Sequence, residues 1–252
     1  MAKVIAEFQE RASTDRKLSF GLYLVFLLVV VIMSGIITGI GWLFEGWGIG
    51  PVVTTAASTL VAIYLWWYNW LLYSRRNNHF NRIKRLKVRL SELLEEKTEV
   101  EKGTLNRVDS FLERKEAPRP NSLFFLWLIL SYLGSFSGFS APLGVLSFVS
   151  LIVGLVVLYY LTTDYYYHEQ GEIAFLQKVT AALGKKGTAL TATPSNPLHT
   201  RSYGLYIFLS IITLGIFCLY WAYVIFHDPN QHFDTHQVWE SELQRIIEKD
   251  LT

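Results

Sequence analysis

Histidines are the residues in this sequence whose chemistry stands out, and there are six of them: His79, His168, His199, His227, His232 and His236. His232 and His236 are four residues apart and Glu240 follows four residues later, so on a helix all three share one face. Two imidazoles and a carboxylate arranged in this way are a ligand set for zinc or a similar ion. The same spacing also occurs in helices that bind no metal. We therefore interpret these histidines as residues of a wet interface, and we predict no metal site and no cofactor.

No set of residues typical of catalysis accompanies them. An intramembrane protease or a proton relay needs ionisable groups inside its spans, whereas the long apolar segments of this sequence contain none, and Asp164 lies only at the end of one. The sequence also contains no phosphate-binding loop, no nucleophile elbow and no His-Glu-x-x-His motif. We therefore predict no catalytic residues and a protein that is not an enzyme.

The composition predicts an integral membrane protein. Charged residues make up 17% of the chain, against about a quarter in ordinary soluble domains, and Leu18–Phe44 contains none. The net charge of +2 is too small to favour nucleic acid as a partner. The lone cysteine, Cys218, provides no disulfide framework.

Five apolar segments are long enough to consider as membrane helices: Leu18–Phe44, Pro51–Tyr73, Ser122–Gly138, Pro142–Thr163 and Tyr203–Phe226. A helix needs about 20 residues to cross a bilayer. The first, second and fourth segments meet this length, and the third is marginal. Strands of a membrane barrel would alternate in polarity, and these segments do not. We therefore predict an all-α, polytopic membrane protein.

The distribution of basic residues predicts the topology. Ser74–Asn121 contains thirteen Lys or Arg residues, whereas the connections near residues 44–50 and 134–141 contain none. Basic residues close to spans favour the cytoplasmic side. We therefore predict a multi-pass protein of the cell membrane, with the N-terminus, Ser74–Asn121 and Asp164–Arg201 in the cytoplasm.

Amphipathic helices follow the second, fourth and fifth apolar segments. Their apolar residues, among them Leu90, Val179 and Leu243, recur at helical spacing between charged residues. The preferred interpretation is that these stripes pack on one another in a small cytoplasmic bundle. The alternative is that one of them binds lipid or a partner helix, and the basic helix that starts at Asn78 is the best candidate for anionic lipid.

Short internal matches indicate a repeat. Ser19–Leu24 is similar to Ser202–Ile207, and Asn77–Asn81 is similar to Asn230–Asp234. The block Asn121–Gly184 shares the same plan with little residue identity. We therefore interpret the chain as three units, each a membrane hairpin followed by a cytoplasmic helix.

The repeat also relates three of the histidines. His79, His168 and His232 each lie near the start of one cytoplasmic helix. We interpret them as polar anchors that face lipid headgroups. His236 is paired by the repeat with Ile83, which argues against a metal site at His236.

The fifth segment has two possible arrangements. Its 24 residues suffice for a single crossing. The repeat instead predicts a short re-entrant hairpin that turns at Thr213-Leu214-Gly215 and returns the tail carrying His232 to a place beside the helix carrying His79.

The resulting organisation has seven parts. They are an N-terminal cytoplasmic segment (1–17), membrane hairpin 1 (18–73), a cytoplasmic helix and linker (74–121), membrane hairpin 2 (122–163), a second cytoplasmic helix and linker (164–202), a third membrane segment (203–226) and a C-terminal amphipathic helix (227–252).

The stretch Thr213–Trp221 resembles a signature, roughly Thr-Leu-Gly-Ile-Tyr-Gly-Ile-Tyr-Trp, of small prokaryotic membrane domains of unknown function. The resemblance extends over Ser202–Trp239. This sequence departs from the signature at Phe217, Cys218 and Leu219. The resemblance implies a short membrane hairpin and no known activity.

We expect a structural or accessory membrane protein that binds a partner or lipid through its cytoplasmic amphipathic helices. Its partners would be membrane lipid and another membrane protein or a second copy of the chain. Gly35 and Gly39 have the spacing that lets helices approach closely, within the chain or between subunits. The alternative function is a small transporter or channel subunit built from repeated hairpins.

Overall fold

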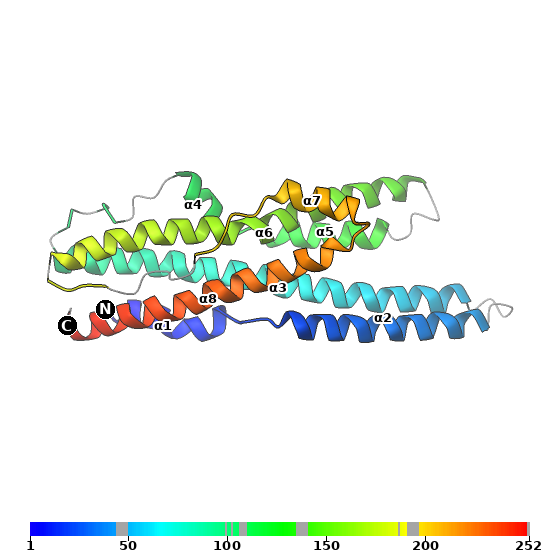
Figure 1. Ribbon diagram of the computed structural model, residues 1–252, viewed down its shortest axis with the longest axis horizontal. Coiled ribbons are helices and arrows are strands. Elements are labelled where there is room, and N and C mark those ends of the chain that lie inside the picture. Colours follow the sequence, from blue (N-terminus) through cyan, green and yellow to red (C-terminus); the bar gives the residue numbers. More distant parts are fainter. Residues whose placement is uncertain are drawn as a thin grey trace. The chain divides into compact units, whose positions relative to one another are not determined.

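The computed structural model describes residues 1–43, 50–98, 100–101, 103–105, 110–134, 141–185, 187–190 and 197–250. The regular secondary structure of these residues is entirely helical, which confirms the all-α class. The helices are α1 (Ala2–Thr14), α2 (Phe20–Leu43), α3 (Gly50–Thr98), α4 (Ser110–Glu116), α5 (Asn121–Gly134), α6 (Ala141–Gly184), α7 (Tyr203–Ile212) and α8 (Phe217–Asp250) (Figure 1). The predicted outer connections at 44–49 and 135–140 lie outside the described residues.

The chain divides into two compact units. The hairpin unit is Leu18–Ser74, and the main unit combines Met1–Lys17 with Arg75–Thr252. In the hairpin unit, α2 packs against the first part of α3 through aromatic side chains. The Tyr64 hydroxyl donates a 2.6 Å hydrogen bond to the Tyr23 carbonyl, and the rings of Tyr23 and Tyr68 are 4.9 Å apart.

Two described helices are long and apolar enough to cross a membrane: α2, and α6 from Gly144 onward. Most large apolar side chains of α2 are exposed, as expected for a helix surrounded by lipid. The helices α5 and α7 are apolar but shorter. The first part of α3, which the sequence predicts as a span, belongs to neither group.

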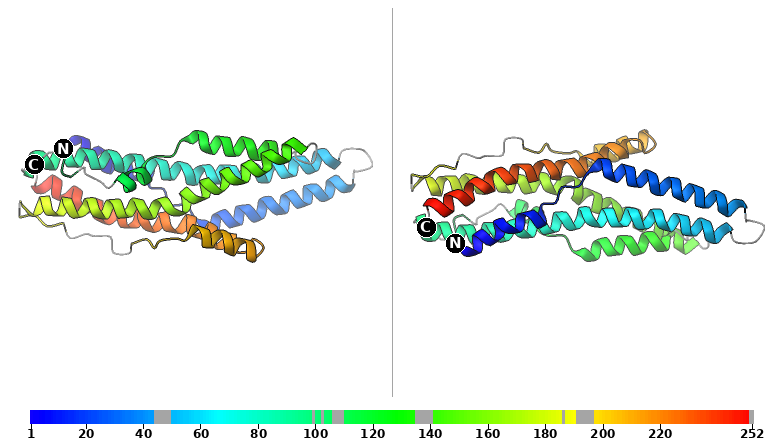
Figure 2. Two further views of the ribbon diagram at one scale, coloured as in Figure 1. Left: turned by 90° about the horizontal axis from the view of Figure 1, so that it is seen from above. Right: turned by 90° about the horizontal axis from the view of Figure 1, so that it is seen from below.

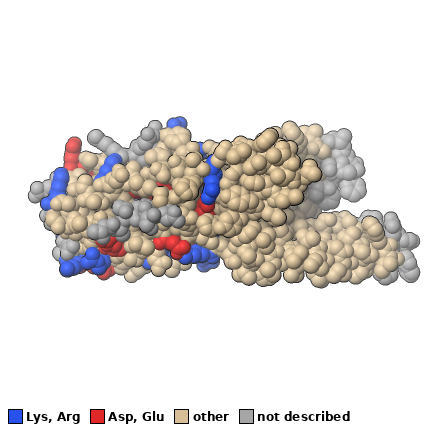
Figure 3. Space-filling model, viewed as in Figure 1, with Lys and Arg blue, Asp and Glu red and all other residues tan. Residues whose placement is uncertain are grey.

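The core of the main unit joins α1, α3, α6 and α8. Leu90, Val179 and Leu243 have no exposed surface and belong to one apolar cluster, which Phe8 of α1 also enters. The prediction that the amphipathic stripes pack on one another is therefore confirmed. On the face drawn in Figure 3, charged side chains gather toward the end of this unit where α1 and the C-terminus of α8 lie.

The long helices continue across the boundaries predicted at 73/74, 163/164 and 226/227. In each case the second helix of the expected hairpin and the amphipathic helix are one element. Within α8, Pro229 has no N–H to donate to the Ile225 carbonyl, four residues earlier. The Arg75 Nη2 atom donates to this carbonyl at 3.3 Å and helps α8 to continue through its proline.

The turn predicted at Thr213-Leu214-Gly215 is present between α7 and α8 (Figure 2). Two residues of the turn have positive φ angles, 51° at Leu214 and 90° at Gly215. Glycine adopts such values without strain, so Gly215 allows the chain to turn here. The chain reverses there, so the rings of Tyr206 in α7 and Trp221 in α8 are 5.7 Å apart. Residues 203–226 therefore do not form a single uninterrupted helix.

Candidate metal centre

Four of the six histidines meet inside the main unit. His79 comes from α3, His168 from α6, and His232 and His236 from α8, and Glu172 of α6 joins them. One potential ligand atom from each of these five residues lies within 4.8 Å of the others. All five residues are at most 3% exposed. We call this group the histidine centre.

The inner atoms of the histidine centre are the Nε2 atoms and the Glu172 carboxylate. The Nε2 atom of His79 lies 3.2 Å from the Nε2 atoms of both His168 and His232. Glu172 Oε1 lies 2.9 Å from His168 Nε2. Glu172 Oε2 lies 2.7 Å from His236 Nε2 and 3.5 Å from His232 Nε2. Ring nitrogens and carboxylate oxygens from three helices therefore converge on one small volume.

The outer Nδ1 atoms of the same rings each face a carboxylate. The pairs are His79 with Asp15 at 2.8 Å, His236 with Glu240 at 2.9 Å, His232 with Glu169 at 3.3 Å and His168 with Glu116 at 3.7 Å. For His79, His232 and His236 the carboxylate is within hydrogen-bond distance, so it holds the proton on Nδ1 and directs Nε2 inward, which is the usual environment of a metal-binding histidine. His168 Nδ1 is buried and forms no hydrogen bond with the described residues.

The protonation states of His79 and His232 make the close approach of their rings unfavourable unless a cation lies between them. Burial lowers the pKa of His79 well below its ordinary value and also lowers the pKa of His232, so both rings are neutral at pH 7. With their Nδ1 protons directed at Asp15 and Glu169, both Nε2 atoms present lone pairs, and these face each other at 3.2 Å. Two lone pairs at that distance repel unless a positive centre lies between them.

The charges of the remaining inner groups are set by one another. Burial would raise the pKa of Glu172, but His168 and His236 outweigh it and hold the pKa well below its ordinary value. Burial would lower the pKa of His236, but Glu172 and Glu240 raise it to about 9. Glu172 is therefore an anion, and a metal ion would displace a proton from His236 on binding.

A second group of possible ligands, Asp15, His236 and Glu240, adjoins the histidine centre. Arg82 of α3 already holds it together. Its Nη2 atom lies 2.7 Å from Asp15 Oδ2 and 2.9 Å from Glu240 Oε1. The guanidinium supplies positive charge to Asp15 and Glu240, so the inner group is better suited to an ion than this second group.

Aromatic side chains wall the histidine centre. The Phe80 ring stacks on His168 with centroids 4.0 Å apart, and the Phe233 ring lies 4.8 Å from His79. Phe80 and Phe233 are at most 3% exposed and belong to a small apolar cluster with Tyr165 and Leu198. A dry wall of this kind strengthens the electrostatic interactions within the site.

These positions correct the sequence interpretation of the histidines. His79, His168, His232 and His236 are buried, so they neither line a wet interface nor face lipid headgroups. The prediction that no metal binds depended on that interpretation. His199 is exposed, and His227 is 45% exposed in its side chain and lies beside Asp228. Neither belongs to the centre.

Some members of the centre were accessible to sequence reasoning and others were not. Glu172 follows His168 by four residues, the same spacing that drew attention to His232, His236 and Glu240. That signal was available and was missed. Asp15 is 64 residues from His79, and no spacing rule relates the two.

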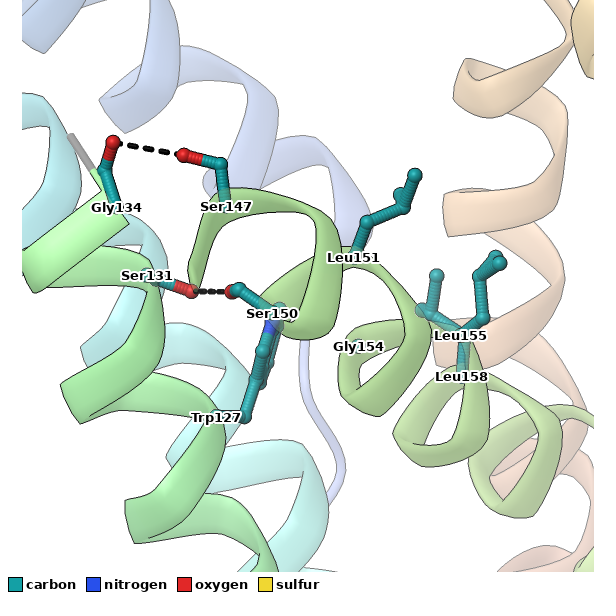
Figure 4. Close-up of a pocket in the computed structure, with 9 residues that line it drawn as sticks. All are labelled: Trp127, Ser131, Gly134, Ser147, Ser150, Leu151, Gly154, Leu155 and Leu158. Carbon is teal, nitrogen blue, oxygen red and sulfur yellow. Dashed lines mark hydrogen bonds between the residues drawn. The ribbon is translucent and has the colours of Figure 1, made fainter. Parts of the chain in front are cut away.

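A second feature is a hollow of about 440 Å³ along the α5–α6 hairpin (Figure 4). Ser131 and Ser150 are joined by a 2.7 Å hydrogen bond between their hydroxyls, and Ser147 donates to the Gly134 carbonyl at 2.7 Å. These hydroxyls pair across the hairpin, as is usual for helices that pack in lipid. The hollow is therefore explained by helix packing.

Comparisons with known proteins identify one stretch of the chain. Residues 201–244 match a family model described as Domain of unknown function (DUF4234). This stretch contains α7, the turn and the part of α8 that carries His232 and His236. It confirms the resemblance to a small domain of unknown function. No curated protein and no solved structure matches the chain.

Proposed function

We propose that this protein is a multi-pass membrane protein of structural or accessory function that holds one divalent transition-metal ion in the histidine centre. The observation that carries the proposal is the convergence of one ligand atom from each of four histidines and from Glu172, on α3, α6 and α8, within 4.8 Å. Imidazole nitrogen with carboxylate oxygen suits first-row divalent metals.

The distances and the surroundings support an ion of this size. Ligand atoms about 2.0–2.1 Å from a metal are roughly 3.0–3.4 Å from their neighbours in octahedral or tetrahedral geometry. The two 3.2 Å separations between Nε2 atoms fall in that interval. The outer carboxylates of Asp15, Glu169 and Glu240 orient the rings as metal sites require.

The proposed role of the ion is to fasten helices together. Each of α3, α6 and α8 supplies at least one ligand, and His79 and His232 are 153 residues apart in the chain. An ion that binds the folded arrangement and not the separated helices adds its binding free energy to folding. This role involves no catalysis.

The proposal includes the arrangement that the sequence predicts around this bundle. The N-terminus and the amphipathic helices lie in the cytoplasm, and three membrane hairpins precede those helices, the third short and re-entrant. Support comes from the Lys and Arg residues of Ser74–Asn121 and from the reversal at Gly215. Because the apolar stripes fill the core, a partner protein or lipid would bind the remaining surface of the bundle and the membrane helices.

Metal analysis of the purified protein tests the proposal. The chain is purified in mild detergent without an affinity tag that binds metal, and its metal content is measured by mass spectrometry. We expect about one ion per chain, and we expect the His79→Ala/His232→Ala variant to lose it. His199→Ala removes an exposed histidine and should leave the content unchanged.

Loss of metal through misfolding is separated from loss of ligands by a second measurement. Wild-type protein is stripped with a chelator and titrated with Co²⁺, and the Co²⁺ that stays bound after desalting is measured by mass spectrometry. Wild-type protein that is folded, binds no Co²⁺ and carries no more metal than the double variant would overturn the proposal.

A further inference from the structure

We infer that the histidine centre binds its ion with six donor atoms, the four Nε2 atoms and both carboxylate oxygens of Glu172, and leaves no coordination position open. The inference rests on the proposed metal binding and specifies the class of ion and the chemistry that the centre permits.

The first argument for six donors comes from the two carboxylate oxygens of Glu172. Its two oxygens face different rings of the same inner volume, with Oε1 2.9 Å from His168 Nε2 and Oε2 2.7 Å from His236 Nε2. Among the described residues, Oε1 is a buried oxygen that forms no hydrogen bond of normal geometry. The ion pair with His168 leaves this buried oxygen without a well-aligned hydrogen bond. A metal ion bound by both oxygens would satisfy it.

The second argument is the number of inward-pointing groups. A structural zinc site takes four ligands in a tetrahedron. Here four imidazoles and a carboxylate point inward. A tetrahedral ion would leave at least one of these five groups buried and unpaired.

The third argument comes from the distances between the donor atoms. In an octahedron with bonds of about 2.1 Å, neighbouring donors are about 3.0 Å apart and opposite donors are about 4.2 Å apart. The neighbour separations run from 2.7 to 3.5 Å, and one ligand atom from each of the five residues lies within 4.8 Å of the others. The group therefore has the size of a metal coordination shell, and the number of inward groups favours six donors over four.

A coordination shell with no open position restricts both the kind of ion that binds and the reactions that it can support. A shell of nitrogen and carboxylate oxygen donors with six positions suits a first-row divalent ion that accepts six ligands, such as Fe²⁺. Metal-assisted hydrolysis and oxygen activation both need an open position for water or substrate. A saturated, buried ion instead suits a structural or electron-carrying role.

Spectroscopy of the metal-loaded, full-length protein tests the inference. Stripped protein is loaded in separate arms with Fe²⁺ under anaerobic conditions and with Zn²⁺, and the number of nearest donor atoms is measured by X-ray absorption. We expect six nitrogen and oxygen donors around Fe²⁺.

Nitric oxide, which binds ferrous iron at an open position, provides the matched chemical test. We expect no iron–nitrosyl signal from wild-type protein. We expect a clear signal from Glu172→Ala, which removes both carboxylate donors. Four nearest donors around Fe²⁺, or a stoichiometric nitrosyl signal from the wild type, would overturn the six-donor centre. Failure of every arm to bind metal would instead overturn the proposed function, so the two failures are distinguishable.

Discussion

The Nε2 atoms of His79 and His232 face each other at 3.2 Å across 153 residues of chain. The opposite nitrogen of each ring meets a carboxylate, that of Asp15 for His79 and that of Glu169 for His232. Both rings are therefore held with their lone pairs directed inward. The contact therefore places α3 and α8 side by side at the histidine centre.

Removing the charge of Asp15 should weaken metal binding without removing a ligand. In Asp15→Asn, the partner that orients His79 loses its negative charge, and such changes typically lower metal affinity by about 10–100-fold. Competition with a coloured chelator measures the affinity. Asp234→Asn changes a carboxylate of α8 that is 60% exposed and should change the affinity less than about twofold. Equal affinities in Asp15→Asn and the wild type would contradict the prediction.

A charge placed in the core of the main unit should destabilise the protein. Leu243 has no exposed surface and contacts the cluster shared by α1, α3, α6 and α8. Leu243→Asp should lower the free energy of unfolding by about 2–5 kcal/mol, because it removes a buried aliphatic group and buries a polar one. Leu90→Asp should lower the free energy of unfolding by a similar amount.

The matched control for Leu243→Asp lies on the same helix. Val238 is 61% exposed, so Val238→Asp should change the free energy of unfolding by less than about 0.5 kcal/mol. Denaturant unfolding in detergent, followed by the helical circular dichroism signal, measures both. Similar midpoints for the two variants would argue against the shared core.

Arg75 and Pro229 should be energetically coupled. Arg75 donates to the Ile225 carbonyl, which Pro229 leaves without its helical donor. In Arg75→Met this buried acceptor loses its partner. In the Pro229→Ala background the new N–H of residue 229 pairs with it, so Arg75→Met should cost less there, by about 1 kcal/mol. A double-mutant cycle of unfolding free energies measures the coupling, and purely additive effects would refute it.

The proposed topology predicts which cysteines react from outside the cell. In a background carrying Cys218→Ser, a cysteine at Lys97 should resist an impermeant thiol reagent in intact cells and react after lysis, because Ser74–Asn121 is rich in basic residues. A cysteine at Glu45, in the predicted outer connection, should react in intact cells. Labelling at Lys97 from outside would place this segment on the wrong side of the membrane for the proposal.

The sequence by itself determined the features that depend on one helix at a time. Apolar segments, the stripes that include Leu90 and Leu243, and the turn at Gly215 follow from composition, from helical spacing and from the backbone freedom of glycine. The sequence also related His79, His168 and His232 by position. A residue's place along a helix fixes the face that it occupies, and no more.

Only the tertiary structure decided what those faces meet. The burial of the apolar stripes sets how α3, α6 and α8 are rotated about their axes, and that rotation turns the three histidines inward, onto one another and onto Glu172, and away from lipid headgroups. Asp15, Glu169 and Glu116 reach the rings from elements whose register depends on the same packing. Such contacts depend on the distance between helices in space, which spacing along a single chain does not determine.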